Sequence, residues 1–182
     1  MTLANILTIF RMVMIPFFVM AAAYDRPDLA LLIFFVAGVT DILDGFIARF
    51  FDQKSALGAI LDPMADKLML TSAFVALAIP ATGLPHVIPM WVPVLTIARD
   101  VVISLLSLVL SLVYEVRSFP PSALGKCPTF FQIAYVVGIL LQNAYGFPGE
   151  IVTAIMWGVA FFTVASGLHY LWRVASQTKG LA

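Results

Sequence analysis

Four aspartates lie within two of the most apolar stretches of this sequence, and their spacing points to a shared chemical role. They are Asp41, Asp44, Asp62 and Asp66. A carboxylate without a partner is costly in a low-dielectric interior, so acids retained there are candidates for a functional site. Residues three or four apart on a helix share one face, with Cβ atoms roughly 5–6 Å apart. The sequence therefore predicts two carboxylate pairs, Asp41 with Asp44 and Asp62 with Asp66.

Small residues accompany both acidic pairs at helical spacing. Gly45 and Ala48 share the stripe of the first pair, and Gly58 shares the stripe of the second. Small side chains let helix backbones approach closely in a membrane. The connection from Arg49 to Ser55 is short, which favours antiparallel neighbouring helices. We therefore expect the two stripes to face each other and the four carboxylates to share one cleft.

Such a cleft suits divalent cations, because carboxylate-rich sites fit Mg²⁺ or Mn²⁺ best. Two ions about 4 Å apart can polarise a diphosphate and stabilise a leaving phosphate. A free carboxylate can accept the proton of an attacking hydroxyl, and Asp66, the last acid of the array, is the predicted base. Arg49 and Lys67 nearby suit a phosphorylated substrate. The alternative is that these acids only cap helix ends or hydrogen-bond within the bundle.

The composition is that of an integral membrane protein. Of 182 residues, 62% are hydrophobic and 11% charged, and the mean hydropathy is +1.04. Apolar runs long enough to cross roughly 30 Å of hydrocarbon predict an all-α membrane protein with six transmembrane helices in one bundle, a single domain over residues 1–182. The predicted spans are Thr2–Tyr24, Leu29–Phe50, Ala56–Pro80, Val87–Val113, Pro128–Tyr145 and Ile151–Trp172.

The distribution of Lys and Arg predicts the orientation. One set of connections and the C-terminal tail contain Arg49, Lys54, Arg117, Lys126, Arg173 and Lys179, whereas the opposite connections contain only Arg26. By the positive-inside rule both termini are expected to be cytoplasmic. The first apolar run lacks a preceding basic stretch and a small-residue cleavage site, so we interpret it as a retained span. We expect a bacterial cytoplasmic membrane, an active site facing the cytoplasm and no nucleic-acid partner.

A polar stripe also runs along the first predicted helix. Asn5, Thr8 and Arg11 recur every third residue within an otherwise apolar segment. We expect them to face the cleft, because Arg11 facing lipid at depth would be costly. The alternative for Arg11 is simple anchoring, with its side chain extended to the membrane interface.

The run Asp41-Ile-Leu-Asp44-Gly45-Phe-Ile-Ala48-Arg49, followed by Gly58-Ala-Ile-Leu-Asp62-Pro-Met-Ala-Asp66, resembles the signature of the CDP-alcohol phosphatidyltransferases without departure. The resemblance extends from Asn5-Ile-Leu-Thr8-Ile-Phe-Arg11 to the six-helix pattern. It implies a membrane-embedded homodimer that transfers a phosphatidyl group from CDP-diacylglycerol to an acceptor alcohol and releases CMP.

The resemblance also implies roles for individual residues. Two divalent ions, Mg²⁺ or Mn²⁺, would be bound by Asp41, Asp44, Asp62 and Asp66, and Asp66 would also be the general base. The CDP portion of the donor would be bound by Gly45, Ala48, Arg49 and Gly58. The polar stripe of Asn5, Thr8 and Arg11 is assigned to the same donor site.

The acceptor alcohol is expected to be recognised by the remaining charged residues, Arg99, Asp100, Arg117 and Lys126. Phosphatidylglycerophosphate synthases, which use glycerol 3-phosphate, usually carry Arg-Glu, then Ser-Gly-Leu-Arg, and later Gly-Lys-x-Lys-Thr-x-x-Gln. This chain has Ser107 in place of the second Arg and Pro128 in place of the second Lys. A small acceptor that carries a phosphate dianion would require those cations, because Arg and Lys form charge-assisted hydrogen bonds with phosphate.

These departures resemble the eukaryotic-type cardiolipin synthases of the same family, which carry Arg-Asp at the fourth helix. The segments from Ala37 to Lys67 and from Phe161 to Ser166 are also similar to theirs. We therefore favour phosphatidylglycerol as acceptor and cardiolipin as product. Glycerol 3-phosphate stays open, because the remaining cations could still form a phosphate pocket. An ion carrier or channel is the alternative of another class, although no second acidic set suggests an inverted repeat.

Overall fold

The computed structural model describes residues 3–50, 58–80, 83–113 and 127–178. The regular elements in these ranges are six α-helices, which confirms the all-α prediction for this part of the chain. They are α1 (Leu3–Ala23), α2 (Pro27–Phe50), α3 (Gly58–Ala78), α4 (Trp91–Val113), α5 (Cys127–Tyr145) and α6 (Gly149–Thr178).

Two helix boundaries differ from the sequence prediction for local reasons. Helix α4 begins at Trp91 rather than Val87, because Ile88 precedes Pro89 and a residue before proline disfavours the helical conformation. The N–H of Ile88 instead donates to the carbonyl of Leu77 at 2.9 Å. Helix α6 continues beyond Trp172 to Thr178, since a helix can extend into polar residues that an apolar run does not include.

A tight turn makes α1 and α2 consecutive antiparallel helices. Asp25 adopts a left-handed conformation with φ 54°, which Asp tolerates better than most residues. The N–H of Asp25 donates to the carbonyl of Ala22, and that of Arg26 to the carbonyl of Ala21. This pattern is a Schellman motif, and Pro27 then occupies the first position of α2, where its missing N–H costs nothing.

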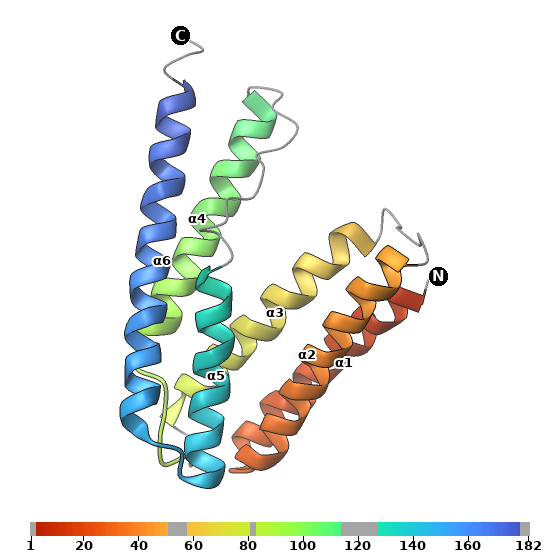
Figure 1. Cartoon of the computed structure of the whole chain (residues 1–182), viewed down its shortest axis with the longest axis vertical. Helices are drawn as coiled ribbons and strands as arrows, with labels where there is room; N and C mark the ends of the chain where they lie inside the picture. Colours follow the sequence, from red (N-terminus) through yellow and green to blue (C-terminus); the bar gives the residue numbers. More distant parts are fainter. Residues whose placement is uncertain (1–2, 51–57, 81–82, 114–126, 179–182) are drawn as a thin grey trace. The chain divides into compact units, whose positions relative to one another are not determined.

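The chain forms two compact units, and the first consists of Met1–Ile88 and Val136–Pro148. Within it, α1 contacts both α2 and α3, and the orange helix α2 runs beside the red helix α1 (Figure 1). The rings of Phe18 and Phe34 meet with centroids 5.9 Å apart. Buried alanines, among them Ala21, Ala30 and Ala37, provide the small surfaces that membrane helices use for close approach.

The second unit consists of Pro89–Tyr135 and Gly149–Ala182. Here the green helix α4 and the blue helix α6 lie side by side (Figure 1). The start of α5 also packs on α6, where the rings of Phe131 and Phe162 stack with centroids 4.6 Å apart. At the start of α4, the rings of Trp91 and of Trp157 on α6 lie with centroids 5.9 Å apart.

Three of the described helices are long and apolar enough to cross a membrane. Their apolar windows are Ile6–Ala23, Cys127–Tyr145 and Gly149–Ser176. Large apolar side chains are also exposed on other helices, as for Phe35 on α2 and Val94 on α4. An exposed apolar surface of this kind is typical of contact with a membrane or with another protein.

Candidate active site

Arg11 of α1 joins two of the predicted metal ligands from two other helices. Its Nη2 lies 2.8 Å from Oδ1 of Asp41 on α2, and its Nη1 donates a hydrogen bond to Oδ1 of Asp66 on α3. The Arg11 side chain is only 2% exposed, whereas those of Asp41 and Asp66 are 44% and 46% exposed. The cation is therefore enclosed by protein, and the two carboxylates remain accessible.

Thr8, one helical turn before Arg11, makes a second polar contact between α1 and α3. Its Oγ1 donates to Oδ1 of Asp62 at 2.5 Å, and the threonine is fully buried. Thr8 thus pairs with Asp62 and Arg11 with Asp66, so residue numbers increase in the same direction along both helices. Helices α1 and α3 therefore run parallel here, and the two contacts are successive steps of one polar interface.

The sequence predicted that the acidic stripes of α2 and α3 would face each other. In the described part of the structure, Asp41 of α2 and Asp66 of α3 are both bonded to one guanidinium that α1 contributes. The helical spacing of Thr8 and Arg11 correctly indicated a polar face directed at the acids. Sequence reasoning assigned these two residues to the donor substrate, and it missed their bonds to the carboxylates because the partners lie on other helices, 30 to 55 residues away in the chain.

The acidic residues fit hard divalent cations in their chemistry. Thr8 and Arg11 contact Oδ1 of Asp62, Asp41 and Asp66, and carboxylate oxygens are the ligands that Mg²⁺ and Mn²⁺ prefer. A positive group, the Arg11 guanidinium, already lies between Asp41 and Asp66. Among the described residues, no group of three or more acidic, His or Cys side chains is close enough to form a metal site. Metal binding by these residues therefore stays a prediction.

Several predicted site residues cannot be placed at the level of side chains. Arg117 and Lys126 lie outside the described residues. The backbone of α1 includes Asn5, and that of α2 includes Asp44, Gly45, Ala48 and Arg49, but their side chains lie outside the described part. Gly58 is buried at the first position of α3.

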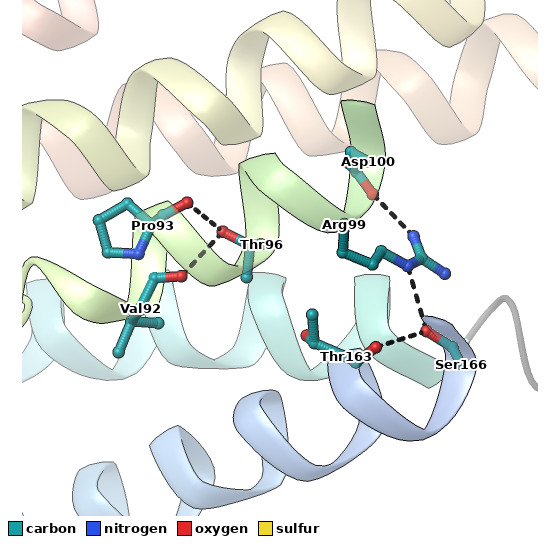
Figure 2. A network of polar contacts seen from close by, with 7 residues as sticks. All are labelled: Val92, Pro93, Thr96, Arg99, Asp100, Thr163 and Ser166. Atoms are coloured by element: carbon teal, nitrogen blue, oxygen red, sulfur yellow. Dashed lines mark hydrogen bonds and ion pairs between the residues drawn. The ribbon is translucent and has the colours of Figure 1, made fainter. Parts of the chain in front are cut away.

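A separate polar cluster in the second unit surrounds Arg99 of α4 (Figure 2). Its Nε donates to Oγ of Ser166 on α6 at 3.1 Å, and its Nη1 donates to Oδ1 of Asp100 at 2.7 Å. The hydroxyl of Ser166 donates in turn to the carbonyl of Thr163 at 3.0 Å. Arg99 is 17% exposed, so two fixed partners orient a guanidinium that is still accessible.

Sequence reasoning did not assign a role to Ser166. The signal was present in the spacing of Thr163, Ser166 and Tyr170, which are three and four residues apart in an otherwise apolar helix. Two turns beyond Arg99, the hydroxyl of Ser107 is 2.6 Å from that of Tyr170. A cavity of about 260 Å³ between α4 and α6 is lined by Arg99, Thr163, Tyr170 and mainly apolar side chains.

The sequence model of the CDP-alcohol phosphatidyltransferases matches residues 1–165. The chain belongs to this family. It is an enzyme of phospholipid biosynthesis that transfers a phosphatidyl group, as the resemblance of its acidic motif implied.

Bacterial relatives carry a more specific name. The chain is 36% identical over 172 residues to a CDP-diacylglycerol–glycerol-3-phosphate 3-phosphatidyltransferase of Haemophilus influenzae, covering 91% of this chain and 89% of that protein. A protein of the same name from Sodalis glossinidius is 38% identical, and the alignment covers 90% of this chain and 86% of that protein. Another from Yersinia enterocolitica is 33% identical, and the alignment covers 92% of this chain and 93% of that protein.

These relatives correct the preference for phosphatidylglycerol as acceptor and cardiolipin as product, which was wrong. That preference depended on two missing cations, at Ser107 and Pro128, and on a resemblance to the eukaryotic-type cardiolipin synthases. The hydroxyl of Ser107 has a partner in Tyr170, so a serine at this position has a packing role that says nothing about a lipid acceptor. The absence of these two cations is weak evidence, because other cations in the same site can bind the phosphate.

Proposed function

We propose that this phosphatidyltransferase uses sn-glycerol 3-phosphate as its acceptor and forms phosphatidylglycerophosphate and CMP from CDP-diacylglycerol. The observation that carries the proposal is that relatives named for this reaction align with about nine-tenths of the chain. The orientation of Arg99 by Ser166 and Asp100 supports it, because a fixed guanidinium suits recognition of a phosphate.

In this proposal the acidic cluster is the site of transfer. Asp41, Asp44, Asp62 and Asp66 bind two divalent ions, Mg²⁺ or Mn²⁺, which when bound neutralise charge on the diphosphate and on the departing CMP. Asp66 accepts the proton of the acceptor hydroxyl. The hydroxyl oxygen then forms a bond to the phosphorus of the phosphatidyl group, and the bond from that phosphorus to the CMP phosphate breaks.

Substrate binding is divided between two sets of residues. We assign the donor to the glycine- and arginine-containing face of the motif and to the polar face of α1, that is, to Asn5, Thr8, Arg11, Gly45, Ala48, Arg49 and Gly58. The acceptor is assigned to Arg99, Asp100, Arg117 and Lys126. For Thr8 and Arg11 the contacts with Asp62, Asp41 and Asp66 support a role close to the reacting groups.

The proposed setting is a bacterial cytoplasmic membrane. All six helices span it as one domain, both termini and the active site face the cytoplasm, and the enzyme is a homodimer. The three long apolar helices and the bacterial relatives support this arrangement. Single cysteines at Lys54 and Pro85, labelled in sealed vesicles, test the topology: reaction of both from the same side would contradict it.

The acceptor is tested with purified enzyme, CDP-diacylglycerol and Mg²⁺ or Mn²⁺. Glycerol 3-phosphate and phosphatidylglycerol are compared as acceptors, CMP release is measured, and the lipid product is identified by mass spectrometry. We expect phosphatidylglycerophosphate with glycerol 3-phosphate and no cardiolipin with phosphatidylglycerol. Cardiolipin formation without product from glycerol 3-phosphate would overturn the proposal.

A further inference from the structure

The bonding of Arg11 is unusual for a residue assigned only to substrate binding. Its side chain is 2% exposed, and both terminal nitrogens contact carboxylates, one from α2 and one from α3. A buried guanidinium is unfavourable unless acids compensate it, and two nearby carboxylates repel each other unless a cation lies between them. Arg11, Asp41 and Asp66 therefore stabilise one another as a set.

The same two carboxylates are proposed metal ligands, so the guanidinium and the metal ions compensate the same negative charge. We propose that Arg11 is an internal counter-cation of Asp41 and Asp66, which competes with divalent ions for the negative charge of these two carboxylates. This inference rests on the proposed metal binding. Metal binding then weakens the contribution of Arg11 to stability, and Arg11 in turn weakens the affinity of the site for metal, because coupling between two cations at one site is reciprocal.

Arg26 provides a matched control for the loss of an arginine. It also pairs with an aspartate, Asp28, with 3.3 Å between Nε and Oδ1. Its side chain is 61% exposed, and exposed ion pairs contribute little to stability. Asp28 is not among the proposed ligands, so replacing Arg26 removes a guanidinium–carboxylate pair without changing the proposed metal site.

The first test is thermal unfolding of the wild type, Arg11→Met and Arg26→Met in detergent without substrate, with EDTA or with Mg²⁺. We expect Mg²⁺ to raise the unfolding temperature of Arg11→Met more than that of the wild type, and Arg26→Met to respond like the wild type. Equal shifts in wild type and Arg11→Met would overturn the inference. No shift in any of the three would instead count against metal binding, and so against the proposed function on which the inference rests.

The second test keeps the inference falsifiable if Arg11→Met does not fold. Arg11→Gln removes the positive charge but keeps an amide that can donate a hydrogen bond to a carboxylate. Mn²⁺ binding to the substrate-free protein is measured by electron paramagnetic resonance. We expect Arg11→Gln to bind Mn²⁺ roughly tenfold more tightly than the wild type, within the range typical of coupled sites. Unchanged or weaker Mn²⁺ binding would overturn the counter-cation role.

Discussion

Replacing Ser166 by alanine tests whether the cluster around Arg99 serves the acceptor. The change removes the oxygen that accepts from Arg99 Nε at 3.1 Å but leaves the bond from Nη1 to Asp100. A hydrogen bond to a charged group contributes about 1.5–3 kcal/mol. Arg99 is 17% exposed, so water replaces part of the lost bond and the lower end of this range applies.

A loss of about 1.4 kcal/mol corresponds to a factor of roughly ten in binding. We therefore expect Ser166→Ala to raise the KM for glycerol 3-phosphate roughly tenfold, with the KM for CDP-diacylglycerol unchanged. The assay is CMP release with each substrate varied while the other is saturating. Thermal unfolding of the variant shows whether the helix pair remains folded.

Ser176 on the same helix is the matched control. Its hydroxyl donates to the carbonyl of Arg173 three residues earlier at 2.9 Å, just as that of Ser166 donates to Thr163, but Ser176 is exposed. Ser176→Ala should leave both KM values unchanged. The reasoning is refuted if Ser166→Ala behaves like Ser176→Ala, or if it raises the KM for CDP-diacylglycerol instead.

Three further predictions concern the acids, the metal and helix packing. Asp66→Asn should lower the rate of CMP release by roughly 100-fold or more, the usual contribution of a general base, while thermal unfolding stays cooperative; full activity would exclude Asp66 as the base. EDTA should abolish CMP release and Mg²⁺ or Mn²⁺ should restore it, whereas full activity in EDTA would exclude a metal-dependent mechanism. Gly158→Ala places a Cβ 2.6 Å from Cδ1 of Phe131 and should cost about 1–3 kcal/mol of stability. Gly38→Ala, with nothing within 4 Å of the new Cβ, should not destabilise, and equal unfolding temperatures for the two variants would contradict this account of packing.

The helices could be predicted from the sequence because each is a run of mainly apolar residues of about the length that a transmembrane helix needs. The end of α2 at Phe50 was predicted to the residue, and the start of α5 at Cys127 to within one. The extension of α6 to Thr178 could not be predicted in this way, since Arg173, Ser176 and Gln177 interrupt the apolar run and hydropathy does not indicate whether a helix continues past such residues.

The site was predictable only in part, for a different physical reason. Spacing within one helix indicates which residues share a face, so the stripes of Thr8 with Arg11 and of Asp62 with Asp66 could be identified. It does not indicate which faces meet. The bonds from Arg11 to Asp41 and from Arg99 to Ser166 join residues far apart in the chain, and only the packing of helices against each other determines them.

Arg11 and Arg99 differ in how their charge is compensated, and this difference bears on their roles. Arg11 is almost completely enclosed and contacts two carboxylates. The negative charge next to it therefore exceeds its own single positive charge. Arg99 contacts one carboxylate and one neutral hydroxyl and is more exposed. A pair of Arg99 and Asp100 carries no net charge, and a phosphate dianion needs positive potential to bind. The proposed acceptor site therefore requires the charges of Arg117 and Lys126 in addition to Arg99. In this proposal Arg117 and Lys126 attract the phosphate, and the guanidinium of Arg99, which is held in a fixed position, mainly orients it.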